Sequence, residues 1–187
     1  MILFINACVR KESRTKILAD RVLAKKGSPV TEIRPSDVDF PTVDEQFLSK
    51  RDKLVANGKF DDPSFKLAAQ FAVADEIVIA APCWDLSFPA ALKQYFEQIN
   101  VLGITFRYTP EGFPQGLCKA EKLTYVTTVG GDFFPEEYGF GYVKALAENF
   151  YGIKNVKLIK AVGLDIDGRD PEKTLDSVLK ETEKNKD

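Results

Sequence analysis

Histidine is absent from the 187 residues of this sequence. A chain without imidazole cannot form a Ser-His-Asp or Cys-His catalytic group, bind zinc through histidine, or use histidine as a charge switch near neutral pH. Any chemistry must therefore rely on other side chains or on a bound cofactor.

Cysteine is scarce, and its spacing does not indicate a metal site. The three cysteines, Cys8, Cys83 and Cys118, are odd in number and form no C-x-x-C motif. Secreted disulfide frameworks usually have even numbers of cysteines, so this pattern favours a reducing compartment.

Long apolar runs and a basic excess are also missing. No apolar stretch approaches the length that spans a bilayer, and the apolar run at the N-terminus has no preceding cationic segment or following cleavage site. The 26 Lys and Arg residues against 28 Asp and Glu residues argue against a face that binds nucleic-acid phosphates. We expect a cytoplasmic protein that binds neither membrane nor nucleic acid.

Four short apolar runs rich in β-branched residues predict buried strands: Ile2 to Ile5, Ile77 to Ala81, Leu123 to Val129 and Val156 to Gly163. A weaker fifth strand is expected at Val30 to Ile33, which follows the helix stop at Lys25-Lys26-Gly27.

Helical patterns separate these runs. Apolar residues recur at helical spacing over 17–22 and 92–99, a further helix is expected near 45–56, and Asp170 with Pro171 begins a last helix. Alternating strands and helices predict one domain over residues 1–187, a three-layer, doubly wound α/β sandwich. Its five-stranded parallel sheet should have the flavodoxin-like order 2-1-3-4-5.

Ligands of such sheets bind beyond the carboxyl ends of the strands, so the loops after the first, third and fourth strands should converge. The first loop, 6–15, carries hydroxyls and cations at the start of a helix and is suited to a terminal phosphate. Alternatively, Ser13 only caps that helix and the charges are solvated.

The other two loops are suited to a flat ring. Residues 81–89 contain the single tryptophan, Trp84, beside prolines and other apolar residues, and could instead pack on their own helix. Residues 127–134 contain Gly130 and Gly131, which allow close approach to a ligand but also form ordinary turns. The aromatic connection 103–119 is expected to cover a ligand or a partner.

At this point the residues resemble a known family. The run APCWDLSFPAALKQYF at 81–96, followed by GITFRYT at 103–109 and by Gly116-Leu117, is similar to the FMN-dependent NADH azoreductases and NAD(P)H quinone reductases. The similarity continues through Gly130-Gly131 and Gly152-Ile153.

The resemblance implies a homodimer with two FMN molecules at its subunit interface, and hydride transfer from NADH or NADPH to FMN and then to a quinone or azo compound. It also implies which residues bind. The phosphate would be held by the first loop, the isoalloxazine ring by the other two, and Tyr108 would reach the partner's site; the binding residues are Cys8, Arg10, Ser13, Arg14, Thr15, Pro82, Cys83, Trp84, Asp85, Leu86, Thr128, Gly130 and Gly131.

Three residues depart from the family pattern. Cys8 replaces the usual Ser, Trp84 the common Tyr and Asp85 the usual Asn. Contacts through the backbone survive all three changes, but the carboxylate of Asp85 cannot donate a hydrogen bond as an amide can, and its charge is unfavourable beside an anionic reduced flavin.

Several alternatives stay open. A flavodoxin-like electron carrier also binds FMN, although such carriers tend to be more acidic than this chain. A hydrolase has no histidine or metal-ligand cluster to support it. Cys8 and Cys83 form either a redox-active pair or two small buried hydrophobes, which is the more common role. The proton source is either water or Tyr108, and the sequence does not separate NADH from NADPH.

Overall fold

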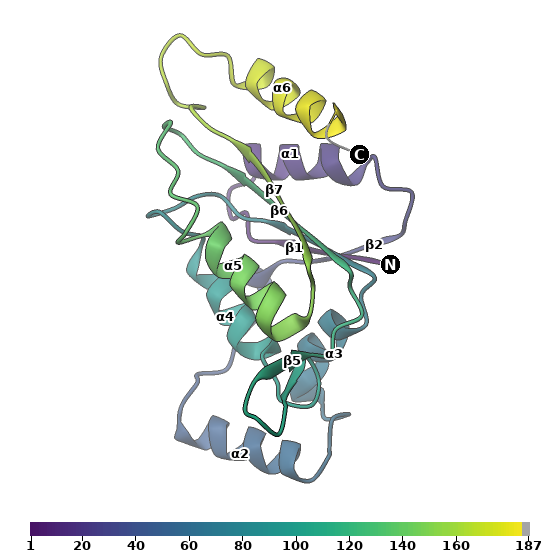
Figure 1. Ribbon diagram of the computed structural model, residues 1–187. Helices are drawn as coiled ribbons and strands as arrows, with labels where there is room; N and C mark the ends of the chain where they lie inside the picture. The colour runs from purple at the N-terminus through teal and green to yellow at the C-terminus, as the bar shows by residue number, and fades with distance from the viewer. Residues whose placement is uncertain (185–187) are drawn as a thin grey trace.

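A computed structural model describes residues 1–184, and a five-stranded parallel sheet forms its centre (Figure 1). The strand order is β2-β1-β3-β6-β7, which confirms the predicted order 2-1-3-4-5. All five strands lie where the apolar runs predict them, at β1 Ile2–Asn6, β2 Val30–Ile33, β3 Glu76–Ala80, β6 Lys122–Thr128 and β7 Asn155–Ala161.

Helices cover both faces of the sheet, so the predicted three layers are confirmed (Figure 1). α1 (Arg14–Leu23) and α6 (Pro171–Lys184) pack on one face. α3 (Lys66–Ala72), α4 (Ala90–Ile99) and α5 (Phe140–Leu146) pack on the other. Single 3₁₀ turns lie at Pro35–Asp37 and Pro63–Phe65.

Side chains that alternate between the two faces of the sheet divide the hydrophobic core into two clusters. In β1, Leu3 and Ile5 face the α3, α4 and α5 layer, whereas Ile2 and Phe4 face α1 and α6. Successive strand side chains point to opposite faces, so a strand that is buried on both sides must be apolar throughout. This explains the unbroken apolar runs of β1 and β3, whereas the edge strands β2 and β7 are only partly buried and include charged residues.

Two helical segments were not predicted. α3 is only seven residues long and buries Ala68 and Phe71 alone, too little for a periodic signal. α5 continues as a π-helical turn over Ala147–Tyr151, and its buried residues Phe140, Val143 and Leu146 do have a spacing of three. That signal was present but weak, because it follows directly on a loop rich in aromatic residues.

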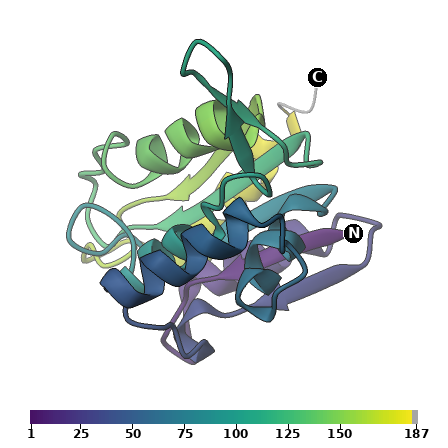
Figure 2. The same cartoon turned by 90° about the horizontal axis from the view of Figure 1, so that it is seen from below.

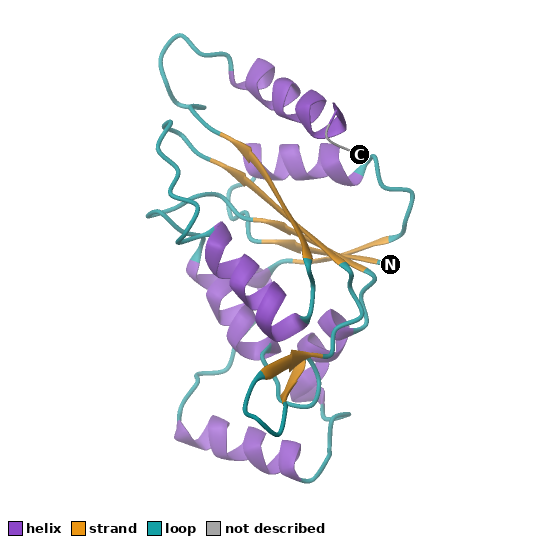
Figure 3. Ribbon diagram, viewed as in Figure 1, coloured by secondary structure: helices purple, strands orange, loops and turns teal. Residues whose placement is uncertain are grey.

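The 103–119 connection forms a small hairpin outside the main sheet (Figure 3). β4 (Phe106–Tyr108) pairs antiparallel with β5 (Pro114–Gly116). Phe106 packs on Phe150 of the π-helical turn, with ring centroids 4.7 Å apart. The hairpin is thereby anchored on the face that carries α5.

The predicted helix near 45–56 is α2 (Glu45–Ala56), and it lies on the outside of the α3 and α4 layer (Figures 1 and 2). Asp44 caps it by accepting a hydrogen bond of 2.8 Å from the backbone N–H of Phe47. None of its residues is buried. No helix within residues 1–184 is long and apolar enough to cross a membrane.

Candidate cofactor site

A cavity of about 380 Å³ lies at the carboxyl edge of the sheet. This volume is in the range of small-molecule sites. As predicted, the loops after β1, β3 and β6 meet there. The predicted site residues that line the cavity are Arg10, Ser13, Arg14, Thr15, Pro82, Cys83, Trp84, Thr128 and Gly130.

The first loop is built around Asn6, the last residue of β1. The fully buried Asn6 side chain accepts a hydrogen bond of 3.0 Å from the backbone N–H of Cys8 and donates one of 2.7 Å to Glu32. An amide paired at both ends has a fixed orientation, so Asn6 holds the first turn of the loop against the neighbouring strand.

Ser13 is the N-cap of α1, as one interpretation of the sequence predicts, and it also lines the cavity. The backbone N–H of Lys16 donates to Ser13 Oγ at 3.3 Å. The backbone N–H groups of Arg14 and Thr15 have no acceptor within residues 1–184. A helix N-terminus with free N–H groups attracts anions.

A hydroxyl pair joins the first loop to the third. Thr15 Oγ1 and Thr128 Oγ1 lie 2.6 Å apart and share one hydrogen bond. Thr15 is 1% exposed, so its position is fixed by packing as well. The polar end of the cavity is therefore assembled from two loops that are far apart in sequence.

The second loop contains a tight, strained turn. Trp84 and Ser87 exchange two backbone hydrogen bonds, of 3.1 and 2.8 Å, which leaves Asp85 and Leu86 at φ +50° and +67°. Left-handed conformations are uncommon for such residues, and strain of this kind clusters at binding sites. The N–H groups of its two central residues have no backbone acceptor within residues 1–184 and are available to a ligand.

An apolar wall flanks this turn. Trp84 is 38% exposed and lines the cavity with Pro82, while Ser87 Oγ donates at 3.2 Å to the carbonyl of Tyr138. That bond ties the second loop to the segment after Gly131. A flat aromatic ligand can pack on such surfaces.

The thiols are poor nucleophiles. Cys8 is 1% exposed, its Sγ lies 3.8 Å from the carbonyl oxygen of Ala80, and burial raises its thiol pKa. Burial, followed by the charge of Asp85, raises the pKa of Cys83. Because the thiolate is the reactive form, both shifts favour the role of small hydrophobes over that of a redox pair.

A fourth loop, which sequence reasoning missed, completes the cavity. Leu164 and Asp165 follow β7 and line it, and Arg14 Nη1 donates to the Leu164 carbonyl at 3.0 Å and to Asp165 Oδ1 at 2.5 Å. The rule that placed the other three loops at this edge applies equally to the fifth strand and would have found it. Val9, Glu12 and Val129 also line the cavity and were not predicted.

The remaining predicted residues lie outside the lining. Asp85, Leu86 and Gly131 belong to the convergent loops but do not line the cavity, and Cys8 is buried below it. Tyr108 is on the β4–β5 hairpin, 53% exposed and outside the cavity of its own chain.

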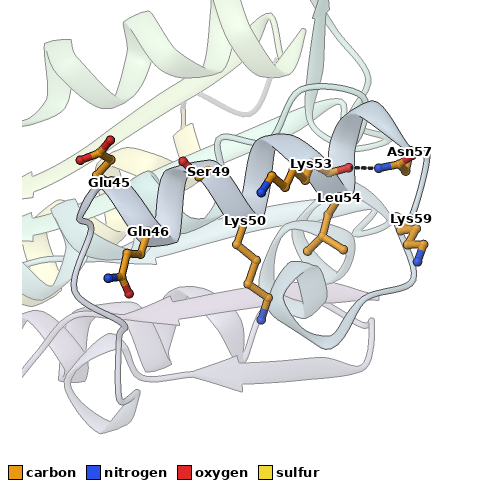
Figure 4. Close-up of a pocket in the computed structure, with 8 residues that line it drawn as sticks. All are labelled: Glu45, Gln46, Ser49, Lys50, Lys53, Leu54, Asn57 and Lys59. Carbon is orange, nitrogen blue, oxygen red and sulfur yellow. Dashed lines mark hydrogen bonds between the residues drawn. The ribbon is translucent and has the colours of Figure 1, made fainter.

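A larger cavity, of about 560 Å³, runs along α2 (Figure 4). All its lining residues belong to α2 and the turn after it, and Figure 4 shows them pointing to either side of the helix. With no opposing wall, this region cannot enclose a ligand, and it contains none of the predicted site residues.

FMN fits the donors of the carboxyl-edge cavity. Free helix N–H groups, hydroxyls and two arginines at one end suit a phosphate dianion, and the Trp84 wall with the free N–H groups of the turn suits a flat heterocycle. Residues 1–184 contain no group of three or more Cys, Asp or Glu side chains arranged to hold a metal ion.

The chain matches the model of the flavodoxin-like fold family over residues 1–185. An FMN-dependent NADH:quinone oxidoreductase of Coprothermobacter proteolyticus is 38% identical over 197 residues, which cover 97% of this chain and 96% of that protein.

Solved structures agree in fold. An azoreductase from Bacillus anthracis str. Sterne superposes with a TM-score of 0.82 at 26% identity, covering 98% of this chain and 96% of its own. An FMN-dependent NADH-azoreductase from Bacillus anthracis str. Ames Ancestor, in complex with FMN, superposes with a TM-score of 0.76 at 25% identity. The match covers 98% of this chain and 95% of that one. The chain belongs to the flavodoxin-like fold family.

Proposed function

We propose that the protein is an FMN-dependent oxidoreductase that uses NADH to reduce quinones or azo compounds. The observation that carries this proposal is the 38% identity, over nearly the whole of both chains, to an FMN-dependent NADH:quinone oxidoreductase. A cavity with a phosphate end and an aromatic end supports it independently. No feature of the described residues favours an electron carrier or a hydrolase.

The polar end of the cavity holds the phosphate. The N–H groups of Arg14 and Thr15 and the hydroxyls of Ser13 and Thr15 donate to its oxygens, and Arg10 and Arg14 balance its charge. Asn6 keeps the loop in place through Cys8. The helix N–H groups and the hydroxyls are positioned before a ligand arrives, so these groups need little ordering on binding.

The aromatic end orients the ring. Trp84 and Pro82 pack along it, and the N–H groups of Asp85 and Leu86 donate to its polar edge. FMN, when bound, supplies the redox chemistry, taking hydride from NADH and passing it to the acceptor. The protein contributes position and exclusion of water, which is consistent with the absence of histidine.

We further propose a homodimer in which the β4–β5 hairpin reaches the partner's site. Three large apolar side chains of this segment are exposed to solvent: Tyr108 is 53% exposed, Phe113 69% and Leu117 38%. Exposed apolar patches of this kind mark interaction surfaces. α2, which has no buried residue, belongs to the surface that a partner can cover. In this arrangement Tyr108 or water provides the proton for the acceptor.

The proposed location is the cytoplasm, because three free cysteines fit a reducing compartment. NADH is the proposed donor, since the relatives are named for it.

Steady-state kinetics test the function. FMN-loaded protein is assayed with NADH and a soluble quinone, and separately with an azo dye. If the donor leaves before the acceptor binds at the same site, the kinetics are ping-pong and double-reciprocal plots give parallel lines. Negligible NADH oxidation would favour an electron carrier, whereas oxidation at the same rate without quinone or dye would mean that dioxygen is the acceptor; either result would refute the proposal.

A further inference from the structure

The polar end of the cavity carries as many carboxylates as cations. Among its lining residues, Arg10 and Arg14 are positive, while Glu12 and Asp165 are negative. A site built only to hold a phosphate dianion gains nothing from two carboxylates, because like charges at close range repel. Their presence needs a reason, and the contacts of Asp165 supply one.

Arg14 is already engaged. Its Nη1 donates to Asp165 Oδ1 at 2.5 Å and to the carbonyl of Leu164 at 3.0 Å. The side chains are 42% and 70% exposed, and ion pairs this open to water are weak. A phosphate that arrives at the helix N-terminus can therefore draw Arg14 away from Asp165.

Asp165 is the fixed member of this pair. Its backbone N–H donates to the Gly130 carbonyl at 2.9 Å, and the N–H groups of Leu164 and Gly163 donate to Val129 and Gly131 at 3.2 and 2.8 Å. A Cβ at Gly130 would overlap Asp165 Oδ2, so glycine makes room for the carboxylate. Arg14, with its long side chain, is the member that can move.

We propose that Asp165 competes with the phosphate of the flavin nucleotide for Arg14, and so sets the affinity of the site for phosphorylated flavin. This inference rests on the proposed placement of the FMN phosphate at the N-terminus of α1. Asp165 lowers the affinity for FMN in two ways, by repelling the dianion and by holding Arg14. Riboflavin, which has no phosphate, is insensitive to both.

Asp165→Asn isolates the charge. Asparagine has the same shape, still accepts a hydrogen bond from Arg14 and preserves the packing over Gly130. The dissociation constant of the Asp165→Asn variant for FMN should be roughly three- to tenfold lower than that of the wild type at low ionic strength. This gain in affinity should shrink as salt is added. The variant's dissociation constant for riboflavin should not change.

A matched control lies on the same helix. Arg21 of α1 pairs with Asp176 at 2.9 Å, about 10 Å further along the helix from Arg14 at 1.5 Å per residue. Asp176→Asn removes an equal charge beside an exposed arginine of α1 that does not line the cavity, and Arg21 keeps its second partner, Glu172, at 2.6 Å. It should leave the affinities for FMN and riboflavin in their wild-type ratio.

The experiment is a fluorescence titration of flavin-free protein with FMN and with riboflavin, for wild type, Asp165→Asn, Asp176→Asn and Arg14→Ala. A selective gain for FMN in Asp165→Asn supports the proposal. Unchanged or weaker FMN binding in that variant, while Arg14→Ala selectively weakens FMN, overturns it and leaves the placement of the phosphate intact. If Arg14→Ala affects FMN and riboflavin equally, the phosphate lies elsewhere and the placement itself fails.

Discussion

Two buried tyrosines differ in whether their hydroxyl group has a hydrogen-bond partner, and this difference should affect stability. Tyr95 and Tyr151 are both fully buried, and burial raises the pKa of each. Tyr151 donates to Asn100 Oδ1 at 2.8 Å, whereas the Tyr95 hydroxyl has no partner within residues 1–184. An unpaired buried hydroxyl costs stability that a paired one does not.

We therefore expect Tyr95→Phe to raise the free energy of unfolding by about 1 kcal/mol, because it removes an unsatisfied group without creating a cavity. Tyr151→Phe is the matched control and should lower it by about 1 kcal/mol, since Asn100 loses its donor. Urea unfolding of the two variants measures both effects. Equal losses in the two variants would show that Tyr95 is hydrogen-bonded.

The turn of the second loop stores strain at Leu86, whose φ of +67° is left-handed. Leu86→Gly should stabilise the flavin-free protein by about 1 kcal/mol, because glycine adopts this conformation without steric cost. The same change at Leu48, on the exposed face of α2, should destabilise by about 1 kcal/mol. The denaturant midpoints of the two variants and of the wild type measure these effects. A loss of stability in Leu86→Gly would mean that the turn is unstrained.

Residue types predicted much of the site, and geometry determined the rest. Hydroxyls and cations before a helix identified Ser13, Arg14 and Thr15, and the single tryptophan identified the apolar wall. Asp165 was missed because a carboxylate is not what a phosphate site attracts, and its link to Arg14 spans 151 residues. Sequence spacing cannot show such a pair.

Among the elements, those with strong periodicity were predicted and those without it were not. Four of the strands and the helices α1, α2, α4 and α6 each have a clear apolar pattern or cap, and β2 has a weaker one. α3 is too short for a pattern, and the β4–β5 hairpin has strands of only three residues. Their positions depend on tertiary contacts.

One such contact joins two glycines that the family resemblance included. A Cβ at Gly116 of β5 would overlap the backbone of Tyr151 and Gly152, which end the π-helical turn. Gly116→Ala should therefore destabilise the protein by roughly 2 kcal/mol, because backbone cannot yield as a side chain can.

Thermal unfolding measures this effect, with Gly27→Ala as the control. A Cβ at Gly27 would have no heavy atom of the described residues within 4 Å, so that variant should melt with the wild type. If Gly116→Ala also melted with the wild type, the hairpin would not be packed against the π-helical turn.

At the scale of the whole molecule, the exposed hairpin predicts self-association. The wild-type protein should sediment at about twice its chain mass of 20.9 kDa. Phe113→Asp should shift it to the monomer, because a charge at this 69% exposed position opposes burial in an interface. Val30→Asp, a similar change on the edge strand β2, should remain dimeric. A wild-type monomer would refute the dimer.

The central claim is that the carboxyl-edge cavity holds FMN that NADH reduces. The most direct test is the visible absorption spectrum of the purified protein, incubated with FMN, desalted, and recorded anaerobically before and after NADH is added. We predict that flavin is retained and that its absorbance bleaches promptly. Flavin that stays oxidised with both NADH and NADPH, or flavin that is not retained even by Asp165→Asn, would contradict it.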